Sequence, residues 1–223
     1  MAVSPRTGDA YISAGTAMAV LSGRTNQIIA TIKAGSYPTT AISPATGKVY
    51  TESGGCNPHG GAGCSGDVSV INGQTNKVIA DDSLTAEPGQ ISFGPRNGDV
   101  YVSTGSLSVP GANADEITVI SGRADMIIDT IKFPVCDAAA SPASFAISKR
   151  TGNLYVPIAS GPACRPYSVQ EVSGQTNKII GAVRLPTPGE LTVANPVNDK
   201  VYVVRPNSLT SNIGSYVASV IAG

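Results

Sequence analysis

The chain has 223 residues, of which 13% are charged, and its 15 basic residues balance its 15 acidic ones. This neutrality argues against nucleic-acid binding through a basic surface and against attachment to anionic lipid. No apolar run reaches the roughly 20 residues that a membrane-spanning helix needs. The 25 Gly and 16 Pro instead predict a protein with many turns.

One motif recurs five times and defines a repeat of about 40 to 50 residues. In the second repeat it reads Ser-Pro-Ala-Thr-Gly-Lys-Val-Tyr, at 43–50. The other four copies of this motif end at Tyr11, Tyr101, Tyr155 and Tyr202. A second motif, Val-Ile-Asn-Gly-Gln-Thr-Asn at 70–76, has a counterpart after each of the other tyrosines. The last counterpart has only Val220-Ile-Ala-Gly223, so we expect three strands in the fifth repeat.

Each repeat reads as four short strands, which in the second repeat are expected near 40–43, 49–51, 67–71 and 77–80. Short alternating runs rich in β-branched residues predict strands rather than helices. Thr-Gly, Asn-Gly and Ser-Gly pairs supply the positive-φ positions that tight hairpins need. Corresponding strands are expected in the other repeats, for example at 28–32, 116–120, 126–131, 145–148, 178–183 and 201–204.

Four antiparallel strands at this period are typical of a propeller blade, whose apolar faces are covered by neighbouring blades. We therefore predict an all-β β-propeller of four-stranded antiparallel blades, with four complete blades and a three-stranded fifth. The expected single domain spans 1–223, with blades at about 1–37, 38–87, 88–141, 142–187 and 188–223. A five-bladed ring and an arc of a larger propeller both remain open, and a β-sandwich is the alternative fold.

The repeats resemble the YVTN family of β-propeller repeats, found in YncE-like bacterial proteins and in archaeal surface-layer proteins. The resemblance covers essentially the whole chain and is carried by Gly35-Ser-Tyr-Pro38, Val68-Ser-Val-Ile71, Thr75-Asn76 and Tyr101-Val102. It implies a propeller fold, in many relatives with seven blades. It says little about function, because the repeated residues form strands and turns.

Two sets of connections are expected on opposite faces of the propeller. We call the face with the short, nearly constant turns the turn face, and the opposite one the loop face. The loop face is expected to carry the insertions, at 53–66, 104–115, 133–143, 158–167 and 206–215. Variable loops on a rigid scaffold are typical binding sites. Neutral drift of exposed loops is the alternative.

All four cysteines fall in the expected loop-face insertions. Cys56 and Cys64 bracket one insertion, while Cys136 and Cys164 lie in two insertions that the propeller topology brings together. We predict the disulfides Cys56–Cys64 and Cys136–Cys164, and hence a secreted, periplasmic or cell-surface protein. Four free thiols in a cytosolic protein are the alternative. The first residues, Met1-Ala-Val-Ser-Pro-Arg6, do not have the pattern of a signal peptide.

Two groups of residues are weak candidates for holding a metal ion. Cys56, His59 and Cys64 could supply three ligands, but they lack a clear fourth ligand and the usual paired spacing. Asp81 and Asp82 could hold Ca²⁺ together with backbone carbonyls, although such a pair is more often solvated. We therefore predict no cofactor, with Ca²⁺ or another divalent ion as the alternative.

The candidate binding residues lie at the mouth of the central channel and on the loop face. Gln90, Ser144 and Glu190 follow the prolines that precede the innermost strands. Arginine and tyrosine are favoured at interfaces. On that basis the further candidates are Arg165, Tyr167, Arg184 and Arg205.

The preferred function is a non-catalytic scaffold that recognises an unknown protein or small ligand through its loop face. A metal-dependent lyase or lactonase-like hydrolase would need His or several acidic ligands at the channel mouth, where only Glu190 is charged. No Gly-x-Ser-x-Gly motif occurs. This enzyme is one alternative, and a single-stranded DNA-binding propeller is a second. An unclosed ring would favour self-association.

Overall fold

The computed structural model describes residues 1–35, 38–56, 64–104, 116–133, 144–158, 167–186, 189, 191–206 and 216–221. Regular structure in these ranges consists of β-strands in five antiparallel sheets. Four sheets have four strands and the last has three. The predicted all-β propeller, with four complete blades and a three-stranded fifth, is therefore confirmed. No helix that could span a membrane occurs in these ranges.

The strands of each sheet are paired in sequence order. Blade 1 contains β1 (Ala2–Val3), β2 (Ala10–Ala14), β3 (Ala17–Leu21) and β4 (Ile28–Lys33). Blade 2 contains β5 (Thr39–Ile42), β6 (Val49–Cys56), β7 (Cys64–Asn72) and β8 (Lys77–Leu84). Blade 3 contains β9 (Pro88–Phe93), β10 (Val100–Thr104), β11 (Glu116–Ile120) and β12 (Ile127–Lys132). Blade 4 contains β13 (Ala146–Ile147), β14 (Leu154–Ile158), β15 (Tyr167–Val172) and β16 (Ile179–Leu185). Blade 5 contains β17 (Leu191–Ala194), β18 (Val201–Pro206) and β19 (Tyr216–Ile221).

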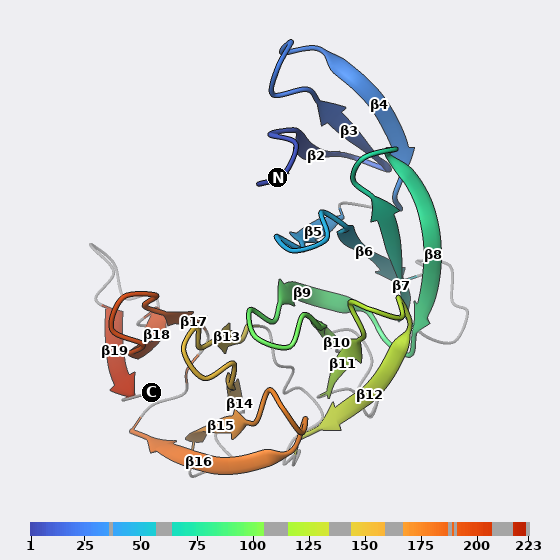
Figure 1. Cartoon of the computed structure of the whole chain (residues 1–223). Helices are drawn as coiled ribbons and strands as arrows, with labels where there is room; N and C mark the ends of the chain where they lie inside the picture. The colour runs from blue at the N-terminus through green and yellow to red at the C-terminus, as the bar shows by residue number, and fades with distance from the viewer. Residues whose placement is uncertain are drawn as a thin grey trace, which may run out of the picture.

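The five blades follow one another around an open arc, with their first strands toward the centre and their last strands at the rim (Figure 1). Apolar clusters fill the space between successive blades. Between blades 1 and 2, for example, Tyr11 and Val20 pack with Val49 and Ile71, and all four side chains are 0% exposed. Equivalent clusters join the later pairs of blades. Burial of such a side chain contributes about 1.5–3 kcal/mol, so stacking of blades forms the core.

Among the described residues, blade 1 and blade 5 each pack against one neighbouring blade only (Figure 1). In blade 5, Leu191, Val193 and Val220 are 60%, 63% and 55% exposed. In blade 1, Val3 is 56% exposed. Apolar side chains that are covered inside the arc are therefore accessible to solvent at its ends.

The turns of one blade contact each other at close range. A Cβ added to Gly73, in the turn between β7 and β8, would lie 2.1 Å from the carbonyl oxygen of Gly47, in the turn between β5 and β6. Gly47 itself has φ of 74°, which strains residues with a side chain. The glycines of the repeated motifs therefore have a steric role, as well as a conformational one.

Blade 2 differs from expectation in the length of its strands. The expected insertion at 53–66 is shorter, because β6 continues to Cys56 and β7 begins at Cys64. The long β7 also pairs with β8 up to Leu84. Asp81 and Asp82, which follow the strand expected at 77–80, therefore lie within β8, where they pair with Ser69 and Val68 of β7.

Candidate functional site

The repeated tyrosines of blades 1, 2 and 3 connect each of these blades to the following one at the turn face. The Tyr11 hydroxyl donates to Asn76 Oδ1 at 2.8 Å and to the Gly73 carbonyl at 3.3 Å. In the same way, Tyr50 donates to Asp125 Oδ1 at 3.1 Å. The Tyr101 hydroxyl lies 3.4 Å from Asn177 Oδ1. Each acceptor occupies the turn before the last strand of the next blade, where its φ is 55°. We call this interaction the Tyr–turn contact.

Charge strengthens the Tyr–turn contact between blades 2 and 3. Lys48 Nζ lies 2.6 Å from Asp125 Oδ2, and the same carboxylate accepts from Tyr50. Burial, and then the nearby Asp125 carboxylate, raise the pKa of Tyr50 well above its ordinary value. The hydroxyl therefore remains a donor over the whole physiological pH range.

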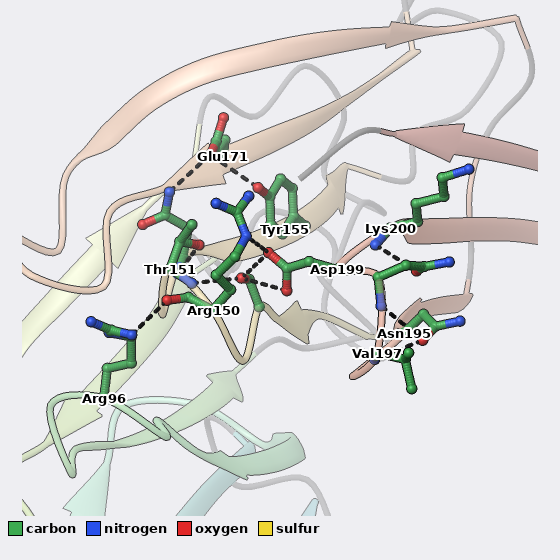
Figure 2. A network of polar contacts seen from close by, with 12 residues as sticks. Arg96, Arg150, Thr151, Tyr155, Glu171, Asn195, Val197, Asp199 and Lys200 are labelled. Carbon is green, nitrogen blue, oxygen red and sulfur yellow. Dashed lines mark hydrogen bonds and ion pairs between the residues drawn. The ribbon is translucent and has the colours of Figure 1, made fainter.

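The contact between blades 4 and 5 follows a different pattern (Figure 2). The Tyr155 hydroxyl donates to Glu171 Oε1 of its own blade at 3.1 Å. Burial, and then the Glu171 carboxylate, raise the pKa of Tyr155 to about 12. Blade 5 instead inserts the buried Asp199, which accepts from Ser148 Oγ at 2.7 Å and lies 3.3 Å from Arg150 Nε. Asp199, with φ of 60°, replaces the turn glycine of the other repeats.

The turn face also carries a pocket of about 400 Å³ between blades 2 and 3. Its lining includes Lys48, Phe93, Asn97 and Arg123. Two of these polar groups already have partners, because Lys48 is paired with Asp125 and the Asn97 amide donates to the Gly174 carbonyl at 2.7 Å. The polar groups that line the pocket therefore serve mainly to hold neighbouring blades together.

Two predicted site residues lie in contacts between inner strands. Gln90 Nε2 donates to the Phe145 carbonyl at 3.0 Å, and Gln90 Oε1 accepts from the Phe145 amide at 2.9 Å. This side chain therefore joins blade 3 to blade 4 as a strand backbone would. Ser144 Oγ accepts from the Thr192 amide at 2.9 Å and so joins blade 4 to blade 5.

Sequence reasoning did not single out two buried glutamates of blades 2 and 3. Glu52 accepts from the hydroxyl and the amide of Thr39, the latter at 3.3 Å. Burial raises the pKa of Glu52, and the charge of Glu87 adds to this effect. Glu116 Oε1 accepts from the Thr85 hydroxyl at 2.6 Å. A glutamate in a strand usually faces solvent. In the sequence, only the position of Glu52 and Glu116 next to residues expected to be buried could have indicated that these two side chains are buried.

The other predicted site residues do not form one cluster in the described ranges. Tyr167 is buried in the core between blades 4 and 5, whereas Arg184 is exposed on β16. Arg205 belongs to β18, and Cys56 and Cys64 face each other as Cα partners in the ladder between β6 and β7. Outside the described residues lie His59, Cys136, Cys164, Arg165 and Glu190.

The acidic pair of blade 2 has two different environments. Asp81 accepts from Ser69 Oγ at 2.6 Å. Asp82 Oδ2 is buried with no hydrogen-bond partner among the residues that the structure describes, and burial raises the pKa of this carboxyl. Within those same residues, no three His, Cys, Asp or Glu side chains are grouped so that they could hold a metal ion.

Comparisons with known proteins reveal a likeness in fold. No family model matches the chain, and no curated protein matches it either. Among solved structures, hydrazine synthase of Kuenenia stuttgartiensis matches 99% of this chain with a TM-score of 0.70 and 17% identity. The Dos1 propeller matches 88% with a TM-score of 0.62 and 11% identity. The chain spans 61% and 50% of the lengths of these two proteins. Together with the five stacked sheets, these likenesses show that the chain has the β-propeller fold.

Proposed function

We propose that the chain is a non-catalytic scaffold that binds a protein partner through its loop face. The observation that carries this proposal is that polar side chains near the centre of the arc are hydrogen-bonded within the fold. Gln90, Ser144 and Glu52 are engaged in hydrogen bonds within or between blades. Their chemistry therefore maintains the fold, and the loop-face insertions are the parts free to differ between repeats.

The Tyr–turn contacts favour this role because they fix the blades relative to one another. A rigid scaffold presents loops without a large loss of conformational entropy on binding. Propellers use this arrangement widely, with constant strands and variable connections. The turn face is a poorer candidate for the interface, because the contact between Gly73 and Gly47 leaves no room for larger residues there.

Capture experiments with loop-face and turn-face variants test the proposed interface. Biotinylated protein would be incubated with secreted and envelope fractions of the source cells, and enriched proteins identified by mass spectrometry. The loop variant replaces 57–63 by a Gly-Ser linker, and the control replaces the exposed turn-face residues Arg24 and Arg123 by Ala. We expect the loop variant to lose the partner and the control to keep it. Loss in the control alone, with both variants folded by circular dichroism, contradicts the proposal.

We also propose that the protein is exported and that Cys56 and Cys64 form a disulfide. Direct Cα partners in an antiparallel ladder lie about 4.5–5.5 Å apart, within the range of disulfide geometry. Mass spectrometry of the native protein under non-reducing conditions should reveal a peptide pair linked through these residues. Alkylation of both thiols without prior reduction would contradict this assignment.

A further inference from the structure

The turn face has a positive charge that the neutral composition of the chain conceals. Its nine described turns, each closed by a backbone hydrogen bond, contain ten of the 15 basic residues but only four of the 15 acidic ones. The turns between first and second strands carry Arg6, Lys48, Arg96, Lys149, Arg150 and Lys200. The turns before the fourth strands carry Arg24, Lys77, Arg123 and Lys178. Charge is therefore separated in space, because five basic and 11 acidic residues are left for the rest of the chain.

The four carboxylates of these turns do not cancel this charge at the surface. All ten cations except Lys48 are exposed, whereas none of the four aspartates is. Asp125 and Asp199 are engaged in ion pairs. Asp9 and Asp99 accept from glycine amides of the next turn in their own blades. The aspartates thus connect the turns, and the side chains that reach solvent are basic.

Contacts between neighbouring blades make the turns one continuous surface. Arg6 donates to the Ala45 carbonyl and so links blades 1 and 2. Arg96 Nη1 donates to the Arg150 carbonyl at 2.7 Å and links blades 3 and 4 (Figure 2). The two ion pairs link blades 2 and 3 and blades 4 and 5. The exposed cations therefore lie on a single extended surface.

Exposed aliphatic side chains border the cations at the rim, where the fourth strands lie (Figure 1). In each complete blade they come directly after the turn, as Ile28 and Ile29, Val78 and Ile79, Met126 and Ile128, and Ile179 and Ile180. Ile28 is 66% exposed and Ile180 is 57% exposed. Because a strand rises about 3.3 Å per residue, the first two residues lie within about 7 Å of the turn. Apolar side chains of proteins bound at the membrane surface enter the bilayer to a similar depth, about 5–10 Å.

We propose that the turn face is a docking surface for a membrane that contains anionic lipids. The exposed cations contact the lipid headgroups, and the aliphatic residues at the start of the fourth strands enter the interface beside them. These are the two signals that stable attachment to a membrane requires. A bilayer needs no complementary pocket, so the close packing of the turns does not prevent this contact. The loop face is then directed away from the membrane.

The same observations favour lipid over nucleic acid as the partner of the turn face. Proteins that bind single strands combine a cationic groove with aromatic side chains on which bases stack. The nine described turns contain no Phe, Tyr or Trp, and the residues beside the cations are aliphatic. The net charge of zero predicted no attachment to anionic lipid. Salt screens charges beyond about 8–10 Å, however, so a membrane at the turn face interacts mainly with the charges of that face.

Binding of the whole chain to lipid vesicles tests the proposal. Vesicles of phosphatidylcholine with phosphatidylglycerol would be compared with vesicles of phosphatidylcholine alone, by co-sedimentation over a range of lipid concentrations. We expect binding only to the anionic vesicles, with an affinity that falls as NaCl is added. Hydrogen exchange of the parent chain should slow in the turns, for example at 22–27, 72–77 and 173–178.

Two triple variants with the same net charge separate the turn face from the rest of the rim. Gln in place of Arg24, Lys77 and Lys178 should weaken binding about 100-fold, at about fivefold for each cation near an anionic bilayer. The control has Gln in place of the exposed Lys33, Lys132 and Arg184, which lie at or near the opposite ends of the fourth strands. Its affinity should stay close to that of the parent chain.

A pair of changes within β16 tests the aliphatic contact. Ile180→Gln should weaken binding about fivefold, the effect of burying roughly half of an isoleucine side chain. Val183→Gln, at an exposed position farther from the turn, should have little effect. Circular dichroism would check that every variant is folded.

Several results would overturn the proposal. They are equal binding to vesicles without anionic lipid, equal losses in the two triple variants, and exchange protection confined to residues outside the turns. Tighter binding to a single-stranded oligonucleotide than to the anionic vesicles at the same salt concentration would also overturn it, and would assign the basic surface to nucleic acid. None of these results depends on the protein partner proposed for the loop face.

Discussion

Removal of one hydroxyl group from Tyr11 should measurably destabilise the propeller. The Tyr11→Phe change keeps the ring in the core and removes only the donor to Asn76 Oδ1, at 2.8 Å, and to the Gly73 carbonyl, at 3.3 Å. A buried hydrogen bond of this type contributes about 1 kcal/mol, and loss of two acceptor contacts raises the expected cost to about 1–2 kcal/mol. For a chain of this size each kcal/mol lowers Tm by about 2–4 °C.

Tyr202→Phe is the matched control, because this tyrosine holds the same place in blade 5. Its side chain is half-buried, and its hydroxyl has no hydrogen-bond partner among the residues that the structure describes. Urea unfolding followed by circular dichroism would compare both variants with the parent at constant m-value. We expect a change within about 0.5 kcal/mol for Tyr202→Phe. Equal destabilisation by the two changes would refute the idea that the Tyr–turn contact stabilises the arc.

Three further changes have defined outcomes. Gly73→Ala should cost about 1–3 kcal/mol, from the 2.1 Å approach to the Gly47 carbonyl, and a smaller loss of free energy of unfolding in urea would contradict that steric role. Asp199→Gly should cost about 1–2 kcal/mol in the same assay, because the buried Ser148 hydroxyl loses both acceptor oxygens, although backbone strain at 199 is relieved; unchanged stability would argue against this buried hydrogen bond. Folding raises the pKa of Glu52, so the protonated side chain contributes its full stabilisation at pH values below its pKa in the unfolded chain. This stabilisation is lost as the pH rises through its pKa in the folded protein. Glu52→Gln should therefore flatten the fall of the urea midpoint above about pH 4, and an unchanged slope would contradict this.

The repeated motifs were sufficient to predict the blades. Pro-x-x-Gly turns and the tyrosine strands indicated the second strand of each repeat, and the structure has the four four-stranded sheets and the three-stranded fifth sheet that the repeat predicted. Strand ends were harder to predict, because β6 and β7 continue as a hairpin to Cys56 and Cys64 through residues that resemble a loop. Composition alone does not show how far a ladder will extend when its partner strand is also long.

The contacts between blades could not be predicted in the same way. Tyr11 and Asn76 both belong to repeated motifs, but their sequence separation hides the fact that one reaches the other. The available signal was that a tyrosine in the second strand and an Asn or Asp in the later turn occur together in four repeats. Gln90 and Ser144 were predicted as binding residues, yet residue type could not distinguish a ligand contact from a hydrogen bond between blades.

The direction of the Tyr–turn contact has a consequence for how such chains change length during evolution. Tyr11, Tyr50 and Tyr101 each take an acceptor from the turn of the unit that comes next. Loss of blade 3 as a whole would bring Tyr50 next to Asn177, which offers the same type of oxygen as Asp125. Deletion of blade 3 as a whole would therefore preserve a Tyr–turn contact at the new junction, whereas a deletion that removed only the turn containing Asp125 would leave Tyr50 without this acceptor.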